Sequence, residues 1–155
     1  MRSASEIIYD LEDLYREYTD YTKEREKEGL GTTLKNWFLG NNKERRPENI
    51  NFYESVEHLT DEMLKVVEAT ETEDARQILA ARTCEILFNQ PVRKKGGDDR
   101  DLYVAAMMSQ GKKFLAHISA EDAPRLIEII DRLPSYYMMP VQMEIKKELK
   151  AKNQA

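Results

Sequence analysis

The sequence predicts an all-α protein, a compact orthogonal or bundle-like array of about six to seven helices around a central helix near residues 75–89. Two observations favour this class. Apolar residues recur at spacings of three and four along most of the chain, which is the period of a helix with one buried face. No segment shows the sustained alternation of a strand or a hairpin turn between β-branched runs. The length of 155 residues is typical of one domain, so we expect a single helical domain over 1–155.

The first long helix is expected over 5–28, because its apolar residues repeat every three or four positions. They are Ile7, Leu11, Leu14, Tyr18 and Tyr21. A short helix is expected over 33–39, which contains the only tryptophan, Trp37. The polar stretch 41–49 contains Pro47 and is predicted to be a loop.

The next helix is expected over 51–69, with the same spacing of apolar residues. They are Phe52, Val56, Leu59, Met63 and Val66. Residues 70–73 then fit a capping box, and either Thr70 or Thr72 could cap the helix that follows. That helix should extend to about Asn89, because Pro91 disfavours helical backbone just before it.

The segment 75–89 is predicted to be the centre of the fold. Between Ile78 and Phe88, apolar residues lie on all sides of the helix, and the only charges are Arg82 and Glu85. A helix that is apolar all round is normally covered by neighbours on several faces.

Three further helical regions are expected in the C-terminal part. A helix capped by Asp98 or Asp99 should continue to Ser109. Gly111 should interrupt the helical pattern, and a short helical piece should follow over 114–118. Another should start within 119–124 and end at Pro134, and the last should span 140–152.

A weak internal repeat has an offset of 48 residues. Residues 73–79 resemble 121–127, and the apolar positions of 56–67 match those of 104–115. The period is near that of helical repeat arrays, although acidic helix starts are also common for electrostatic reasons alone.

The charge distribution limits the possible partners. The net charge of −5 argues against nucleic acid, which needs a basic face. Residues 1–75 carry 19 acids and 10 bases, whereas residues 76–155 carry 10 acids and 14 bases. The two halves could attract each other within one fold, or the C-terminal half could bind an anionic partner. The chain has one cysteine and no apolar stretch that fits a signal peptide or a membrane span, so we expect a cytoplasmic protein with no membrane partner.

The sequence offers little material for catalysis. Cys84 lies in the apolar helix, where burial makes a thiol inert, and His117 is its most plausible partner. His58 has Glu54 and Glu62 four residues away and is expected on the surface, paired with acids. No cofactor motif or metal-ligand spacing occurs, so we expect no cofactor and no metal.

Arg82 and Glu85 are the charged residues with the most unusual position. They could pair with each other or with charges on another helix, at the edge of the core. Alternatively, Arg82 could line a cavity and bind a carboxylate or phosphate through its planar guanidinium. Arg93, Lys94 and Lys95 form a basic loop that is either solvated or in contact with an anion.

A second candidate surface follows Pro134 and is rich in tyrosine and methionine. Its members are Tyr136, Tyr137, Met138, Met139 and Met143. Such residues either form a buried connection between helices or a surface for protein binding or self-association. The predicted function is therefore a non-enzymatic protein-interaction or adaptor domain with an unknown protein partner or a second copy of the chain. The alternative is a small-molecule or anion sensor that uses Arg82 in a helix-lined pocket.

Overall fold

The computed structural model describes residues 2–27, 45–90, 100–133 and 140–154, and this part of the chain contains only helices and their connections. The predicted all-α class is confirmed. The predicted helix over 33–39 lies outside the described residues. The elements are α1 (Ala4–Lys27), α3 (Arg45–Ala69), α4 (Glu73–Phe88), α5 (Arg100–Lys112), the 3-10 helix η2 (Leu115–His117), α6 (Ala123–Asp131) and α7 (Pro140–Gln154).

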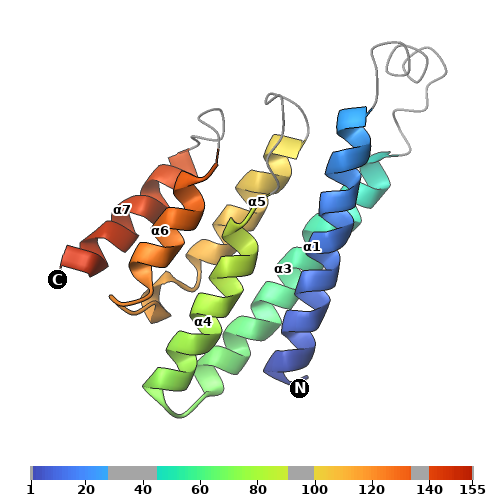
Figure 1. The fold of residues 1–155 in the computed structure, drawn as a ribbon. Helices are drawn as coiled ribbons and strands as arrows, with labels where there is room; N and C mark the ends of the chain where they lie inside the picture. The colour runs from blue at the N-terminus through green and yellow to red at the C-terminus, as the bar shows by residue number, and fades with distance from the viewer. Residues whose placement is uncertain (1, 28–44, 91–99, 134–139, 155) are drawn as a thin grey trace.

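The helices form two layers (Figure 1). Helices α1, α4 and α6 lie side by side in one layer, and α3, α5 and α7 form the layer behind it. Consecutive α-helices run in opposite directions, so the chain forms three helical hairpins, which we call the first (α1/α3), second (α4/α5) and third (α6/α7) hairpins. They are stacked in chain order, so among the described residues the first and third hairpins each have one free edge.

The stacking explains where the internal repeat falls in space. The matching stretches 73–79 and 121–127 lie at the starts of α4 and α6, which hold corresponding positions in successive hairpins. Val56 on α3 and Val104 on α5 also match, and both are buried. The similar patterns therefore serve the same packing role in neighbouring hairpins.

Helix α4 is central, as predicted. It packs against α1, α3, α5, α6 and η2, and its fully buried side chains include Cys84, Leu87 and Phe88. Neighbours cover it on several faces, as expected, but not at Ile78, which is 67% exposed. As the middle helix of its layer, α4 has neighbours beside and behind it but none in front among the described residues. Its outer face presents Ile78, Arg82 and Glu85, and the C-cap residue Asn89 continues this row at spacings of four, three and four.

Gly111 does not interrupt α5, contrary to the sequence prediction. The helix continues to Lys112, and a Cβ atom on Gly111 would lie 2.3 Å from Cε1 of Phe88. The missing side chain therefore lets the Phe88 ring pack directly on the α5 backbone. The Cys84 thiol donates a hydrogen bond to the Gly111 carbonyl, with Sγ 3.5 Å from the oxygen.

Two predicted helix boundaries also differ. Helix α3 begins at Arg45, within the segment predicted to be a loop. Pro47 is compatible with this start because it lies in the first turn, where backbone N–H groups have no helical partner. Thr72 caps α4 by accepting a hydrogen bond from Ala75 N at 3.3 Å. Thr70 is not the cap, since its hydroxyl donates to the Val66 carbonyl at 2.7 Å.

Candidate functional site

The outer face of the α1–α4–α6 layer contains a groove of about 280 Å³, which we call the arginine groove. Helix α4 forms its middle, with α1 on one side and α6 on the other. Ile86 and Ile129 form its apolar floor, and they are only 7% and 5% exposed. The charged and amide side chains that line it are Glu12, Arg82, Glu85, Asn89, Arg125 and Arg132.

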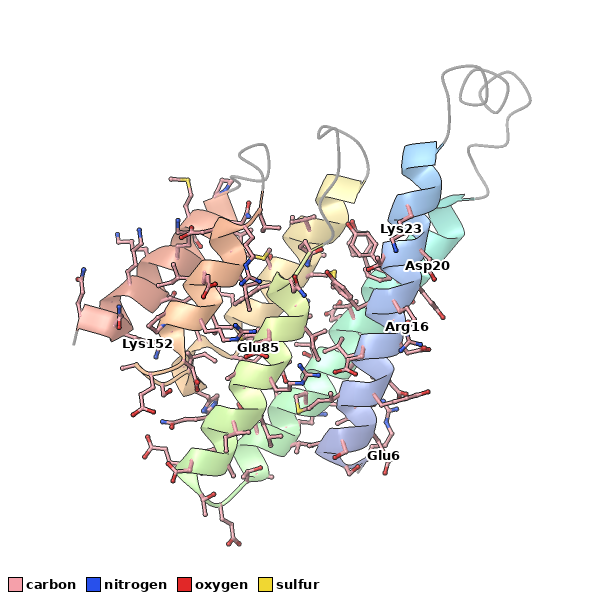
Figure 2. All side chains as sticks on the ribbon, in the orientation of Figure 1. Glu6, Arg16, Asp20, Lys23, Glu85 and Lys152 are labelled. Carbon is pink, nitrogen blue, oxygen red and sulfur yellow. The ribbon has the colours of Figure 1, made fainter. Side chains whose placement is uncertain are left out.

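A chain of ion pairs crosses the groove. Arg82 pairs with Glu12 of α1, and its Nη1 atom lies 3.7 Å from Oε2 of Glu85. The other carboxylate oxygen of Glu85 lies 3.4 Å from Nε of Arg125 on α6. Figure 2 shows Glu85 on α4, between α1 and α6. The two alternatives raised for Arg82 therefore coincide, since it pairs with acids and also lines a groove.

Arginine is the most frequent charged residue in the lining of the groove. Three guanidinium groups face two carboxylates there, and Arg132 also pairs with Glu128 at 2.9 Å. The side chains of Arg82, Arg125 and Arg132 are 49%, 60% and 59% exposed. Ion pairs with this much solvent contact are weak, typically below about 1 kcal/mol. A carboxylate from another molecule could therefore replace an internal one at small energetic expense.

Sequence reasoning identified Arg82 but missed Arg125 and Arg132. Residues 125 and 129 of α6 and its C-cap residue 132 share one side by their spacing of four and three, as residues 82 and 86 of α4 and its C-cap residue 89 do. The spacing on each helix indicates a shared site only when α4 and α6 are known to be neighbours.

The other candidate residues do not join this groove within the described part of the chain. Met143 is 57% exposed and lies on α7, in the opposite layer from Arg82. The remaining candidates lie outside the described residues, so the structure does not test them. They are Arg93, Lys94, Lys95, Tyr136, Tyr137, Met138 and Met139.

Cys84 and the histidine His58 are placed as expected. Burial, with a smaller contribution from the charge of Glu85, raises the pKa of the Cys84 thiol far above its usual range. A thiol in this state is not a nucleophile. His58 lies at the surface, where its Nε2 atom is 2.6 Å from Oε1 of Glu62.

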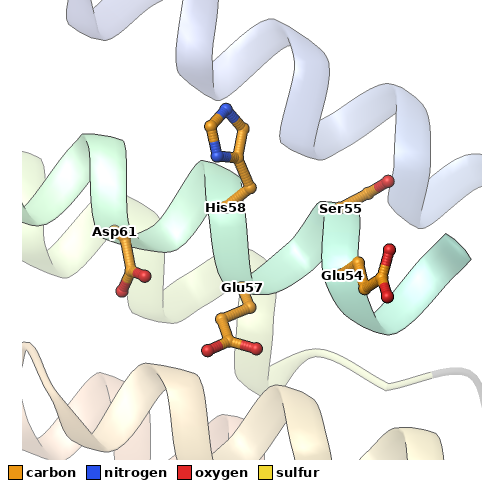
Figure 3. Close-up of a pocket in the computed structure, with 5 residues that line it drawn as sticks. All are labelled: Glu54, Ser55, Glu57, His58 and Asp61. Carbon is orange, nitrogen blue, oxygen red and sulfur yellow. The ribbon is translucent and has the colours of Figure 1, made fainter. Parts of the chain in front are cut away.

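A second hollow, of about 590 Å³, lies along the exposed side of α3 and is lined by residues of that helix (Figure 3). His58 points toward α1, whereas Glu57 and Asp61 point to the other side of α3. Asp61 pairs with Lys113 at a distance of 3.2 Å. Within the described ranges, no group of three His, Cys, Asp or Glu side chains is arranged to hold a metal ion.

Comparison with models of protein families, with curated proteins and with solved structures gives no match to this chain. Among the helices that the structure describes, none has both the length and the apolar character needed to cross a membrane. The function is therefore argued from the arginine groove itself.

Proposed function

We propose that this chain is a protein-interaction domain whose arginine groove binds an acidic segment of a partner protein. The observation that carries the proposal is the gathering of Arg82, Arg125 and Arg132 around an apolar floor. A guanidinium group can donate two parallel hydrogen bonds to one carboxylate. The floor formed by Ile86 and Ile129 would receive an apolar side chain of the same segment.

The openness of the arginine groove favours a protein partner over a small molecule. Pockets for small ligands usually enclose most of the ligand surface. Here each arginine side chain keeps about half of its surface or more in solvent. Arginine is enriched in protein interfaces, where part of its surface can be covered by the partner.

A small anion is the second candidate ligand, and one observation favours it. Asn89, the C-cap residue of α4, lies in the same groove as the three arginines, so an amide and several guanidinium groups could hold one multivalent anion. The two candidate ligands differ in whether they cover the apolar floor of the groove. An acidic peptide would bury Ile86 and Ile129 further, whereas a small anion would bind at the rim alone.

The test uses a phage-displayed library of random short peptides, selected on the whole protein. Enriched peptides should carry acidic residues beside an apolar one. A synthetic peptide of the enriched sequence should bind R125E/R132E at least about tenfold more weakly than wild type, as expected for charged contacts at the centre of an interface. Fluorescence polarisation measures the affinity.

The matched control is K147E/K150E, which makes the same charge change on α7. Both lysines are exposed and lie in the opposite layer from the groove. This variant should bind the peptide with an affinity close to that of wild type. Selection of peptides without acids, or equal binding by R125E/R132E, would contradict the proposal. Stabilisation by phosphate or citrate in a thermal-shift assay, lost in R125E/R132E and without any peptide binding, would favour the small anion.

A further inference from the structure

The two free edges of the stacked hairpins carry opposite charge. Helices α1 and α3 of the first hairpin contain 14 acidic and 7 basic residues. Helices α6 and α7 of the third hairpin contain 4 acidic and 5 basic residues. Figure 2 shows Arg16 and Asp20 on α1 at one end of the array and Lys152 on α7 at the other. The chain is therefore electrically polarised along the direction in which its hairpins stack.

The free edge of the first hairpin has a hollow of about 270 Å³ between α1 and α3, which we call the acidic edge. Asp10, Asp13 and Glu17 line it from α1, and Leu14 and Leu59 provide apolar surface. Two cations and a histidine also face this region. Arg2 pairs with Asp10, Arg16 pairs with Asp13 at 3.1 Å, and His58 lies on the α3 side. The Asp10 and Asp13 side chains remain 42% and 47% exposed, so both stay accessible to another cation.

The free edge of the third hairpin carries an exposed stripe on α7, which we call the basic edge. Met143, Lys147 and Lys150 form it at a spacing of four and three, and all three are exposed. Buried Ile145 and Leu149 mark the opposite side of the helix.

The ion pairs of α7 show that this stripe faces away from the other hairpins. Lys112 of α5 donates to Glu144 with Nζ 2.7 Å from Oε2, which lowers the pKa of Glu144, so that side of α7 faces the second hairpin. Lys146 pairs with Asp131 at 2.5 Å, so that side faces α6. The helix positions of Met143, Lys147 and Lys150 lie on the remaining side.

We propose that the basic edge of one copy of the chain docks on the acidic edge of a second copy. Lys147 and Lys150 would place their ammonium groups among the carboxylates of Asp13 and Glu17, with their aliphatic stems on the apolar part of the hollow. Met143, 57% exposed in the single copy, would cover Leu14.

The geometry of the chain supports this contact. Within one copy, the second hairpin packs between the first and third, and a docked copy would continue this order by placing its first hairpin beside the third. Such a contact joins two different surfaces, so it produces a ring if the rotation closes and an open chain if it does not. The arginine groove takes no part in it, and the two proposals can fail separately.

The first measurement is the mass of the wild-type protein by sedimentation velocity over a range of protein concentrations. At about 0.01 M salt, where charges act over roughly 30 Å, the mass should rise above that of one chain as concentration rises. At about 1 M salt, where the range is roughly 3 Å, the protein should be monomeric. A wild-type protein that stays monomeric at both salt concentrations overturns the proposal.

Charge reversal of each edge gives the second measurement. K147E/K150E and D13K/E17K should each weaken self-association at low salt by at least about tenfold, because like charges then face each other. An equimolar mixture of the two variants should associate, since each supplies the edge that complements the other. The chain with all four substitutions should associate with itself.

Two results would overturn the proposal at this stage. The first is self-association that neither double variant weakens. The second is a mixture that stays monomeric although circular dichroism shows both variants helical. Binding of the acidic peptide at the arginine groove should be unchanged in every edge variant, which separates this proposal from the proposed function.

Discussion

The inner and outer faces of α4 differ in their surroundings far more than their sequences suggest. On the inner face, Cys84, Leu87 and Phe88 have no solvent exposure. On the outer face, Ile78 is 67% exposed, and the Arg82 side chain is 49% exposed. The same helix therefore contributes to the core with one face and to the arginine groove with the other.

This difference shows that stability and binding depend on different physical terms in one element. A fully buried apolar side chain contributes about 1.5–3 kcal/mol relative to an exposed one. The exposed ion pairs of Arg82 and Arg125 contribute little, typically below about 1 kcal/mol each. Substitutions on the inner face should therefore change unfolding, whereas those on the outer face should change binding.

Gly111→Ala, on the inner side, should have a larger effect than either the alkaline shift at Cys84 or a substitution on the outer face. Helix propensity alone would stabilise an alanine there by about 1 kcal/mol. The added Cβ would lie 2.3 Å from the Phe88 ring, and overpacking of a core usually has an energetic cost of about 1–3 kcal/mol or more. We expect a net loss of about 2 kcal/mol in the free energy of unfolding, measured by urea denaturation.

The control for that variant is Phe88→Leu in the Gly111→Ala background. The smaller side chain should relieve the clash, so the second substitution should destabilise far less than Phe88→Leu does in the wild-type protein. Unchanged or increased stability of Gly111→Ala would show that α4 and α5 are not packed as closely as described.

An intermediate effect is expected from alkaline pH through Cys84. Burial raises the pKa of the folded thiol, whereas the unfolded thiol ionises near its ordinary value of 9.0. The thiol therefore leaves the free energy of unfolding at its full value below pH 9. Above pH 9 the free energy of unfolding falls as the pH rises, because only the unfolded state releases the proton. Relative to Cys84→Ala, wild-type stability should fall by up to about 1.4 kcal/mol per pH unit above 9. Parallel curves for the two proteins would contradict the burial of the thiol.

The smallest effect is expected at Ile78, on the outer face. Ile78→Ser should change the free energy of unfolding by less than about 0.5 kcal/mol, as for most exposed sites. Leu87→Ala on the inner face is the matched comparison and should cost about 2–5 kcal/mol. A loss above about 1.5 kcal/mol for Ile78→Ser would mean that another segment covers the outer face of α4.

The sequence predicted most helices because their buried faces follow a local period. Ile7, Leu11 and Tyr18 repeat at helical spacing on α1, and all three are buried. The C-terminal limit of α4 was predicted for a similar local reason, since Pro91 restricts the residue before it. The start of α3 was not, because a proline is compatible with both a loop and a first helical turn.

The sequence by itself determined the all-α class, most buried positions on α1 and α3, and the buried setting of Cys84. Each of these depends on residue type and on neighbours within a few positions along the chain. Only the tertiary structure decided that Ile78 is exposed, that Gly111 accommodates Phe88, and that Arg125 and Arg132 lie beside Arg82. Those facts depend on which helices are neighbours, and the periodicity of a helix specifies its apolar face without specifying what covers it.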